Sequence, residues 1–359
     1  MRISCSSEYF QLFSSGTFFT LDWRGYLILI YTSFDNIGLV KVLSFLKSHK
    51  AEYLSGQDLS DVLKISRVAV WKHVKRIKTL GYKIEAKQNL GYKLVEDTEL
   101  LLPWEITDGL KTKIIGKRVY YFDNIDSTQN FASSIAQNPK ENGTIIISKK
   151  QSGGKGRMNR KWISPKGGLW FSIILHPKFD VSLVTIFPLA SSLALANTIE
   201  KMLGKKPELK WPNDVTLKNK KVAGMIVDLS LASNNIENLI LGVGINFKID
   251  SVQLEKIIKK TKNYYGASSL VSKVENKNPV KFMQDFLVEL ERVCEVLEQG
   301  NFKKIINDWT KKSSTIGKKV IVSTSSGKIN GKAIRIDNDG ALVISQGKKT
   351  RRILVGDVV

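Results

Sequence analysis

The chain has 359 residues, enough for two or three domains, and its hydrophobic content of 42% excludes a largely disordered protein. Its 56 Lys and Arg against 33 Asp and Glu give a net charge of +23, which favours a polyanionic partner such as DNA, although solvated lysine-rich faces would give the same balance. The two cysteines, Cys5 and Cys294, exclude a disulfide framework and a cysteine-rich metal site, so we expect a reducing, cytoplasmic compartment.

Residues 1–37 are an N-terminal extension to which the sequence assigns no domain. The apolar run over residues 26–31 is too short to cross a bilayer, and Asp22 and Arg24 precede it where a secretory signal would be uninterrupted. We therefore expect no membrane segment here.

Residues 38–98 have the spacing of a winged helix-turn-helix. Apolar residues recur at helical intervals over residues 39–50 and again after the turn at Ser55-Gly56, and a third helix is predicted to begin at Ser66, whose hydroxyl can cap it. Residues 82–86 and 90–95 then predict a hairpin, the wing.

The third helix is predicted to read DNA because it has apolar residues on one face and basic residues on the other. The predicted DNA-binding residues are Ser66, Arg67, Lys72, Lys75 and Arg76. The alternative is a small three-helix module that only mediates protein contact.

Residues 110–310 alternate predicted strands and helices, which indicates an α+β domain built on a sheet, with a connector over residues 100–110. Strands are predicted at residues 119–124, 143–149, 169–175, 208–211, 221–229 and 239–246, and helices at residues 128–137, at 188–203 and within 278–310. In residues 313–359, β-branched residues alternate with turn signals at 325–327, 330–331 and 338–340, which predicts a small β-barrel.

Residues 151–162 are a glycine-rich loop carrying Lys155, Arg157, Arg160 and Lys161. Such a loop can close over an anion, because its glycines permit close approach and positive φ while its cations supply charge. Gly154-Lys155 is not followed by Ser or Thr, so this is no Walker loop, and no Gly-x-Gly-x-x-Gly follows a strand. Taken alone, it could also be a solvated basic turn.

Four further strings occur in a fixed order around this loop. Residues 126–129 (Asp-Ser-Thr-Gln) precede it, and residues 210–214 (Lys-Trp-Pro-Asn-Asp), 221–224 (Lys-Val-Ala-Gly) and 242–246 (Gly-Val-Gly-Ile-Asn) follow it. Together these motifs resemble the biotin protein ligases over roughly residues 39–359. The upstream domain further resembles that of the bifunctional members, which also repress biotin-synthesis operons. The resemblance implies a class II synthetase-like mixed-sheet catalytic domain.

The resemblance also implies roles for individual residues. The implied biotin-binding residues are Ser127, Thr128, Gln129, Gln151, Lys155, Gly156, Arg157 and Lys221, of which Lys155, Arg157 and Lys221 are also the implied catalytic cations. The implied nucleotide-binding residues are Lys210, Asn213, Asp214 and Asn246, with Asp214 also implied as a Mg²⁺ ligand. Trp162 and Trp170 are candidate apolar walls for the ligand, the alternative being ordinary core positions.

The implied activity is ATP-dependent formation of biotinyl-5′-adenylate and transfer of biotin to a lysine of a biotin carboxyl carrier protein of acetyl-CoA carboxylase. Implied partners are that carrier, biotin-gene operator DNA and a second copy of the chain once the adenylate is bound. Two alternatives are a monofunctional biotin ligase with a vestigial DNA-binding module and a lipoate-type ligase.

Four positions depart from the frequent family pattern. Lys155 stands where many members have Arg, Met158-Asn159 replaces a frequent Arg-Gly, and Gln129 replaces a frequent Asn. Lys155 therefore offers a point charge instead of a planar fork.

Overall fold

The computed structural model describes residues 9–12, 19–22, 27–30, 34–50, 52–233, 235–250, 252, 255, 266–272 and 274–358. The chain divides into two compact units, one comprising residues 1–108 with 278–280 and the other residues 109–277 with 281–359. Most of residues 1–37, including Cys5, lies outside the described residues. Within that stretch β1 (Tyr9–Leu12), β2 (Phe19–Asp22) and β3 (Leu27–Ile30) pair in antiparallel order.

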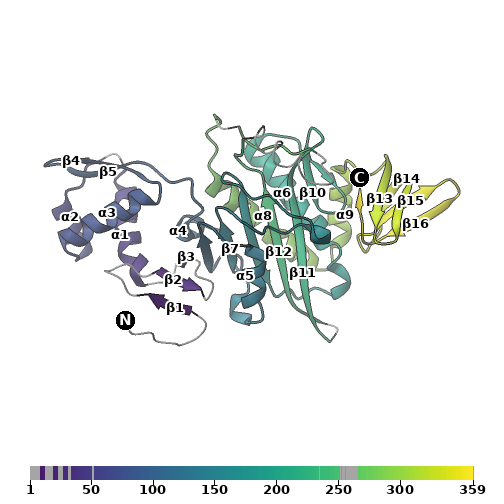
Figure 1. Ribbon diagram of the computed structural model, residues 1–359, viewed down its shortest axis with the longest axis horizontal. Coiled ribbons are helices and arrows are strands. Elements are labelled where there is room, and N and C mark those ends of the chain that lie inside the picture. The colour runs from purple at the N-terminus through teal and green to yellow at the C-terminus, as the bar shows by residue number, and fades with distance from the viewer. Residues whose placement is uncertain are drawn as a thin grey trace. The chain divides into compact units, whose positions relative to one another are not determined.

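The first unit contains the predicted winged helix-turn-helix, which is confirmed (Figure 1). Its helices are α1 (Phe34–Ser48), α2 (Gly56–Leu63) and α3 (Arg67–Thr79), and its wing is the hairpin of β4 (Lys83–Lys87) and β5 (Gly91–Glu96). The Ser66 hydroxyl accepts a hydrogen bond from the N–H of Ala69 at 3.1 Å and so caps α3 as predicted. Val70, Val74 and Ile77 are buried beneath it.

The predicted connector contains a short helix, α4 (Pro103–Thr107), that packs into the first unit. Glu105 is buried. Its two carboxylate oxygens accept hydrogen bonds from Lys47 Nζ at 2.7 and 2.8 Å, and one of them also accepts a hydrogen bond from the Tyr82 hydroxyl. Trp104 Nε1 donates to the same hydroxyl at 2.9 Å. Burial and the Glu105 charge raise the pKa of Tyr82, so its hydroxyl stays protonated and remains the donor.

The second unit is built on a mixed sheet, which confirms the predicted α+β class. Its strands are β6 (Val119–Phe122), β7 (Ile145–Ser148), β8 (Leu169–Leu175), β9 (Glu208–Lys210), β10 (Asp214–Leu217), β11 (Lys220–Ala232) and β12 (Asn235–Ile245), in the spatial order β6-β7-β8-β12-β11-β10-β9. The β6–β7 pair is parallel and the neighbouring pairs beyond it are antiparallel. Strand β10 was not predicted, because this four-residue strand begins at Asp214, the last residue of a Pro-Asn-Asp turn signal.

Helices α5 (Thr128–Ile135) and α6 (Phe187–Leu203) pack against this sheet, α8 (Pro279–Glu298) meets strand β8, and α9 (Phe302–Lys311) packs against α6. Successive strand residues face opposite sides of a sheet. In β8, Ser172 therefore meets Thr128 at the start of α5, whereas Phe171 meets Phe286 of α8 with ring centroids 5.9 Å apart. Trp309 of α9 donates from Nε1 to the Ser192 hydroxyl of α6 at 3.1 Å.

The C-terminal segment, predicted as a small β-barrel, is a small antiparallel sheet. It orders β13 (Lys319–Thr324), β14 (Gly327–Ile336), β15 (Leu342–Gln346), β16 (Lys349–Ile353) and β17 (Asp357–Val358) as β16-β15-β14-β13-β17. The predicted turn at Asn330-Gly331 is wrong, because β14 runs through it. Gly331 serves close packing instead, since a Cβ there would lie 2.3 Å from Ile344 Cγ2.

Candidate active site

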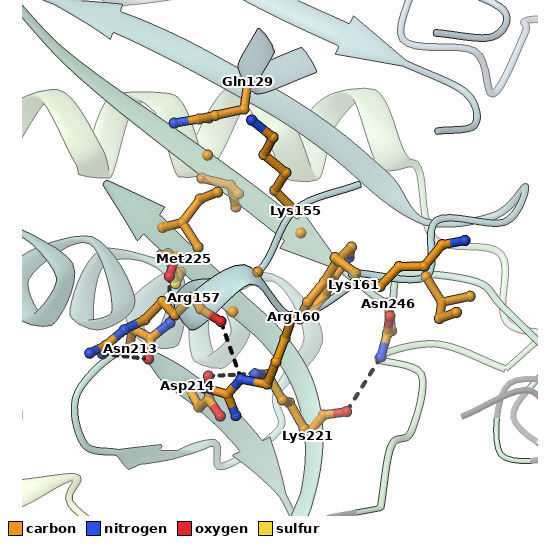
Figure 2. Close-up of a pocket in the computed structure, with 18 of the residues that line it drawn as sticks. Gln129, Lys155, Arg157, Arg160, Lys161, Asn213, Asp214, Lys221, Met225 and Asn246 are labelled. Carbon is orange, nitrogen blue, oxygen red and sulfur yellow. Dashed lines mark hydrogen bonds and ion pairs between the residues drawn. The ribbon is translucent and has the colours of Figure 1, made fainter. Parts of the chain in front are cut away.

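One pocket of about 430 Å³ in the second unit gathers every predicted biotin-binding, catalytic and nucleotide-binding residue. The start of α5, the 151–162 loop, the strands β8, β10, β11 and β12, and β17 contribute to its lining. In the view of Figure 2, Gln129 and Lys155 lie toward one end, and Arg157, Asn213 and Asp214 toward the other. The predicted residues in the lining are Ser127, Thr128, Gln129, Gln151, Lys155, Gly156, Arg157, Lys210, Asn213, Asp214, Lys221 and Asn246.

At one end of the pocket the groups are polar and mostly uncharged. Gln151 Oε1 accepts from the N–H and the hydroxyl of Thr128, at 2.8 and 3.1 Å, and its Nε2 donates to Ser164 at 2.9 Å. These contacts orient the Gln151 amide. Thr128 and Ser172 Oγ also lie 2.9 Å apart.

Gln129 is oriented in the same way. Its Nε2 donates to Asp228 Oδ2 at 3.0 Å and to the Ile240 carbonyl at 3.1 Å, and its Oε1 accepts from Ser172 at 2.9 Å. The Gln129 amide nitrogen thus faces two acceptors and its oxygen faces the Ser172 hydroxyl, which fixes the orientation of the amide. Sequence reasoning missed Ser172, although a lone hydroxyl in the apolar strand Leu169–Leu175 was a signal; nothing in the sequence pattern marked Asp228.

Ser127 is a buried polar residue at this end whose hydroxyl stands apart from these hydrogen bonds. Its side chain is 1% exposed, and its Oγ has no hydrogen-bond partner among the described residues. Leaving a buried hydroxyl unpaired costs about 1–3 kcal/mol, so a ligand atom that accepts or donates a hydrogen bond here would gain affinity.

The 151–162 loop closes on itself through backbone hydrogen bonds. Gly156 N–H donates to the Arg160 carbonyl at 2.7 Å, and Trp162 N–H donates to the Gly154 carbonyl at 2.8 Å. A Cβ at Gly154 would lie 2.5 Å from the Trp162 carbonyl oxygen, so only glycine fits there. The expectation that the loop glycines supply positive φ is wrong: Met158 takes that conformation, with φ of 53°.

At the other end of the pocket the groups are cationic. Arg157 donates from Nη1 to Asn213 Oδ1 and from Nη2 to the Gly356 carbonyl, both at 3.2 Å. Burial lowers the pKa of Arg157, and the negative charges of Asp357 and Asp214 oppose that shift. The guanidinium is thus held rigidly, partly out of water.

Asp357 of β17 completes this cationic end and was missed from the sequence. It forms an ion pair with Arg160 and lies 3.9 Å from Arg157 Nη1. Nearly two hundred residues separate Arg160 from Asp357. No motif or residue spacing in the sequence marks this aspartate as part of the site.

The neighbouring strands β10 and β11 bring a further cation and a carboxylate together. Lys221 Nζ lies 2.6 Å from Asp214 Oδ1 and 5.1 Å from the centroid of the Trp162 ring. Lys210, paired with Asp214 in the β9–β10 register, has its pKa lowered by burial, with the Asp214 charge opposing. Asn246 is buried and donates weakly to the Lys221 carbonyl at 3.4 Å.

The two tryptophans proposed as ligand walls differ. Trp162 lines the pocket, and its buried Nε1 has no partner among the described residues. Trp170 is fully buried, donates from Nε1 to the Pro165 carbonyl at 2.8 Å, and packs edge-on against Trp162. Trp162 is therefore placed as a wall, and Trp170 supports it from the core.

The predicted DNA-binding residues lie on α3 and at its N-cap, in the first unit. Arg67, Lys72 and Lys75 are exposed and Arg76 is half-buried. Ser66 is exposed, but its oxygen is engaged by the helix cap. The arrangement presents cations to solvent along one face, as phosphate contact requires.

Chemically, the pocket can hold a ligand with an uncharged, hydrogen-bonding head at one end and an anionic group at the other. The loop and β10–β11 supply fixed cations where negative charge would be stabilised. In the part of the chain that the structure describes, three or more His, Cys, Asp or Glu side chains nowhere gather as a metal site. Among the described helices, none is long and apolar enough to span a membrane.

Three family models match the chain. The Biotin/lipoate A/B protein ligase family matches residues 121–246, an HTH domain matches 39–93, and the Biotin protein ligase C terminal domain matches 315–359. These segments contain the pocket strands, the helix-turn-helix and the C-terminal sheet, respectively.

Curated relatives and a solved structure agree with these matches. The chain is 31% identical over 309 residues to the bifunctional ligase/repressor BirA of Bacillus subtilis strain 168, covering 86% of this chain and 94% of the relative. It is 27% identical over 313 residues to the bifunctional ligase/repressor BirA of Escherichia coli K12, covering 87% and 94%. A biotin protein ligase from Aquifex aeolicus in complex with biotin and ATP matches with a TM-score of 0.55 and 26% identity, covering 67% of this chain and 97% of that chain.

Proposed function

This chain belongs to the family of bifunctional biotin protein ligase/repressors, and from this premise we propose that it activates biotin with ATP, transfers it to a carrier lysine, and represses biotin genes. The observation that carries the ligase activity is the two-ended pocket. One end offers oriented amides and an unpartnered Ser127 hydroxyl, and the other offers Arg157 and Lys221.

The polar end suits the ureido ring of biotin. That ring has one carbonyl and two N–H groups, so it needs both a donor and acceptors. The Ser127 hydroxyl can donate to the carbonyl, while the oxygens of Thr128 and Gln151 can accept from the N–H groups. The dithiolane ring of lipoate has no such groups, which makes a lipoate-type ligase the weaker alternative.

The first chemical step joins biotin to the α-phosphate of ATP. A carboxylate oxygen attacks the α-phosphorus, the bond to the bridging oxygen breaks, and pyrophosphate leaves. Lys155 and Arg157, which approach from opposite ends of the pocket, bracket the carboxylate and the α-phosphate, with Arg157 the main stabiliser of the developing charge, and Lys221 binds the biotin carboxylate. Lys210, Asn213 and Asn246 hold the nucleotide. The product is the mixed anhydride biotinyl-5′-adenylate.

Mg²⁺ would be held by Asp214 beside the phosphates. A single carboxylate suits this ion, which keeps several waters and takes one or two carboxylates together with substrate oxygens. When bound, the ion neutralises phosphate charge. Because Asp214 pairs with Lys221 at 2.6 Å, the entry of biotin and ATP would redistribute both partners onto ligand groups.

The second step transfers the biotinyl group to the carrier. The neutral ε-amine of a carrier lysine attacks the acyl carbon, the bond to the phosphate oxygen breaks, AMP leaves, and the nitrogen loses a proton. The 151–162 loop and Trp162 shield the anhydride from water until the carrier arrives.

The test is a direct transfer assay. The purified chain is incubated with biotin, ATP, Mg²⁺ and the biotin carboxyl carrier domain of acetyl-CoA carboxylase, and the carrier is weighed by mass spectrometry. We expect one biotinyl group on one lysine. Lipoate offered in competition should not be incorporated, and transfer of lipoate instead of biotin would contradict the proposal.

The repressor function rests on the winged helix-turn-helix. One such module reads a short half-site, so useful operator affinity requires a homodimer, which we propose forms when the adenylate is bound. The test measures binding to DNA upstream of the host's biotin genes, with and without biotinyl-5′-adenylate, at a fixed salt concentration. Failure to bind such DNA above non-specific levels would leave the alternative of a ligase with a vestigial module.

A further inference from the structure

We propose that Val68 and Trp71, on the exposed face of α3, read thymine methyl groups in the major groove of the operator. The inference rests on the repressor function proposed above and adds to it the residues and the base chemistry of specific recognition. Phosphate-binding cations alone would bind DNA without selecting a sequence.

The exposure of these two side chains is the first observation. Val68 is 62% exposed and Trp71 is 51% exposed, although both are large apolar residues. They stand three residues apart, so they share one face of the helix. The opposite face carries Val70, Val74 and Ile77, which bury it against the rest of the unit. Neither Val68 nor Trp71 is therefore needed for the core.

The position along the helix is the second observation. Val68 and Trp71 lie in the first two turns of α3, directly after the Ser66 cap. In helix-turn-helix proteins the N-terminal residues of the recognition helix are the ones that contact base edges. An exposed apolar pair at this place is thus positioned for bases and not for the sugar-phosphate backbone.

The charge around the pair decides what can cover it. Arg67, Lys72 and Lys75 are exposed on the same helix, and Lys75 Nζ lies 5.1 Å from the centroid of the Trp71 ring. A partner must therefore carry anionic groups that contact the cations and, a few ångströms deeper in its surface, small apolar groups that contact Val68 and Trp71. The major groove of duplex DNA does so: phosphates border it, and the thymine C5-methyl is the apolar group on its floor.

The assignment predicts that the affinity for operator DNA depends on the thymine C5-methyl groups. The full chain, loaded with biotinyl-5′-adenylate, is used to select a tight site from random duplex DNA. Every thymine of the selected site is then replaced by deoxyuridine, which removes the methyl and keeps base pairing. We expect deoxyuridine to weaken binding about fivefold or more, as the loss of a specific base-pair contact does.

Variants connect the methyl to the two side chains. In Val68→Ala and Trp71→Ala, affinity for thymine DNA should fall, and the thymine-to-deoxyuridine ratio should approach one. Both residues are exposed, and thermal unfolding should show that the unit remains folded. Lys72→Ala is the matched control: it should weaken binding to both DNAs equally, keep the ratio, and reduce the salt slope by about one.

The outcomes are distinguishable. Selection of no site at all would overturn both the repressor function and this assignment. A selected site that binds equally well with deoxyuridine, or a ratio that survives both substitutions, would overturn the assignment alone. Unchanged DNA binding together with altered self-association in Trp71→Ala would assign the pair to a protein contact instead.

Discussion

Lys221 Nζ and Asp214 Oδ1 lie 2.6 Å apart in the lining of the pocket, so two residues with different proposed ligands neutralise each other. Lys221 is proposed to bind the biotin carboxylate, and Asp214 to hold Mg²⁺. The ion pair with Asp214 therefore competes with a ligand carboxylate for the charge of Lys221.

Asp214→Asn should separate these two roles. The variant frees Lys221, so the Kd for biotin measured by calorimetry without ATP should stay equal or fall. Adenylate formation should drop at least tenfold, since a charged hydrogen-bonding partner is worth about 1.5–3 kcal/mol. Lys221→Ala should instead weaken biotin binding. Equal losses of biotin affinity in both variants would contradict the proposed division.

Arg157→Ala should reduce the rate of adenylate formation by about a hundredfold, because a fixed charge at a developing anion is worth roughly 3 kcal/mol. Pyrophosphate release is the measurement. Lys166→Ala removes an exposed cation just beyond the loop and outside the pocket lining, and should leave the rate unchanged. Near-normal release in Arg157→Ala would remove Arg157 from its role.

The pH profile of the first step should depend on Lys210. Burial lowers its pKa below the ordinary value, so its positive charge is lost at a lower pH than that of a free lysine. Activity should therefore decline as pH rises through the lowered pKa. Lys210→Arg keeps the charge at all accessible pH values and should move the alkaline limb upward; an unmoved limb would assign it to another group.

Met158→Asn should stabilise the protein. Met158 is half exposed and has φ of 53°, a left-handed conformation that costs most residues about 1–2 kcal/mol but that Asn tolerates. We expect the free energy of unfolding in urea to rise by ~0.5–1 kcal/mol. A decrease in the free energy of unfolding would show that packing of the Met158 side chain stabilises the protein by more than its left-handed backbone conformation costs.

Glu105→Ala should destabilise the first unit by about 3 kcal/mol, since it leaves the buried Tyr82 hydroxyl and the partly buried Lys47 ammonium without their acceptor. Glu96→Ala breaks the exposed Lys83–Glu96 pair and should cost less than about 1 kcal/mol. Denaturation of a fragment spanning residues 34–108 is the measurement. Similar losses in the two variants would contradict the anchoring role of Glu105.

Local patterns predicted most of the fold. The Ser66 cap and the 3.6-residue spacing of Val70, Val74 and Ile77 are short-range signals, so the start of α3 was found within one residue. Strand β8 was found with its bounds because a continuous apolar run marks a strand buried on both faces. Strand β10 and the passage of β14 through Gly331 were not found, because pairing with neighbouring strands overrides weak local turn signals.

The sequence by itself determined the family, the order of the domains and the residues gathered around the pocket, because motifs such as residues 210–214 and 151–162 keep their chemistry wherever the chain places them. Only the tertiary structure decided which of those groups are paired. Asp357 reaches Arg160 from the last strand, Ser172 joins Gln129 from β8, and Lys221 meets Asp214 across neighbouring strands. Hydrogen bonds and ion pairs depend on distances of about 3 Å between side chains, and no spacing along the chain encodes contacts between strands so far apart in sequence.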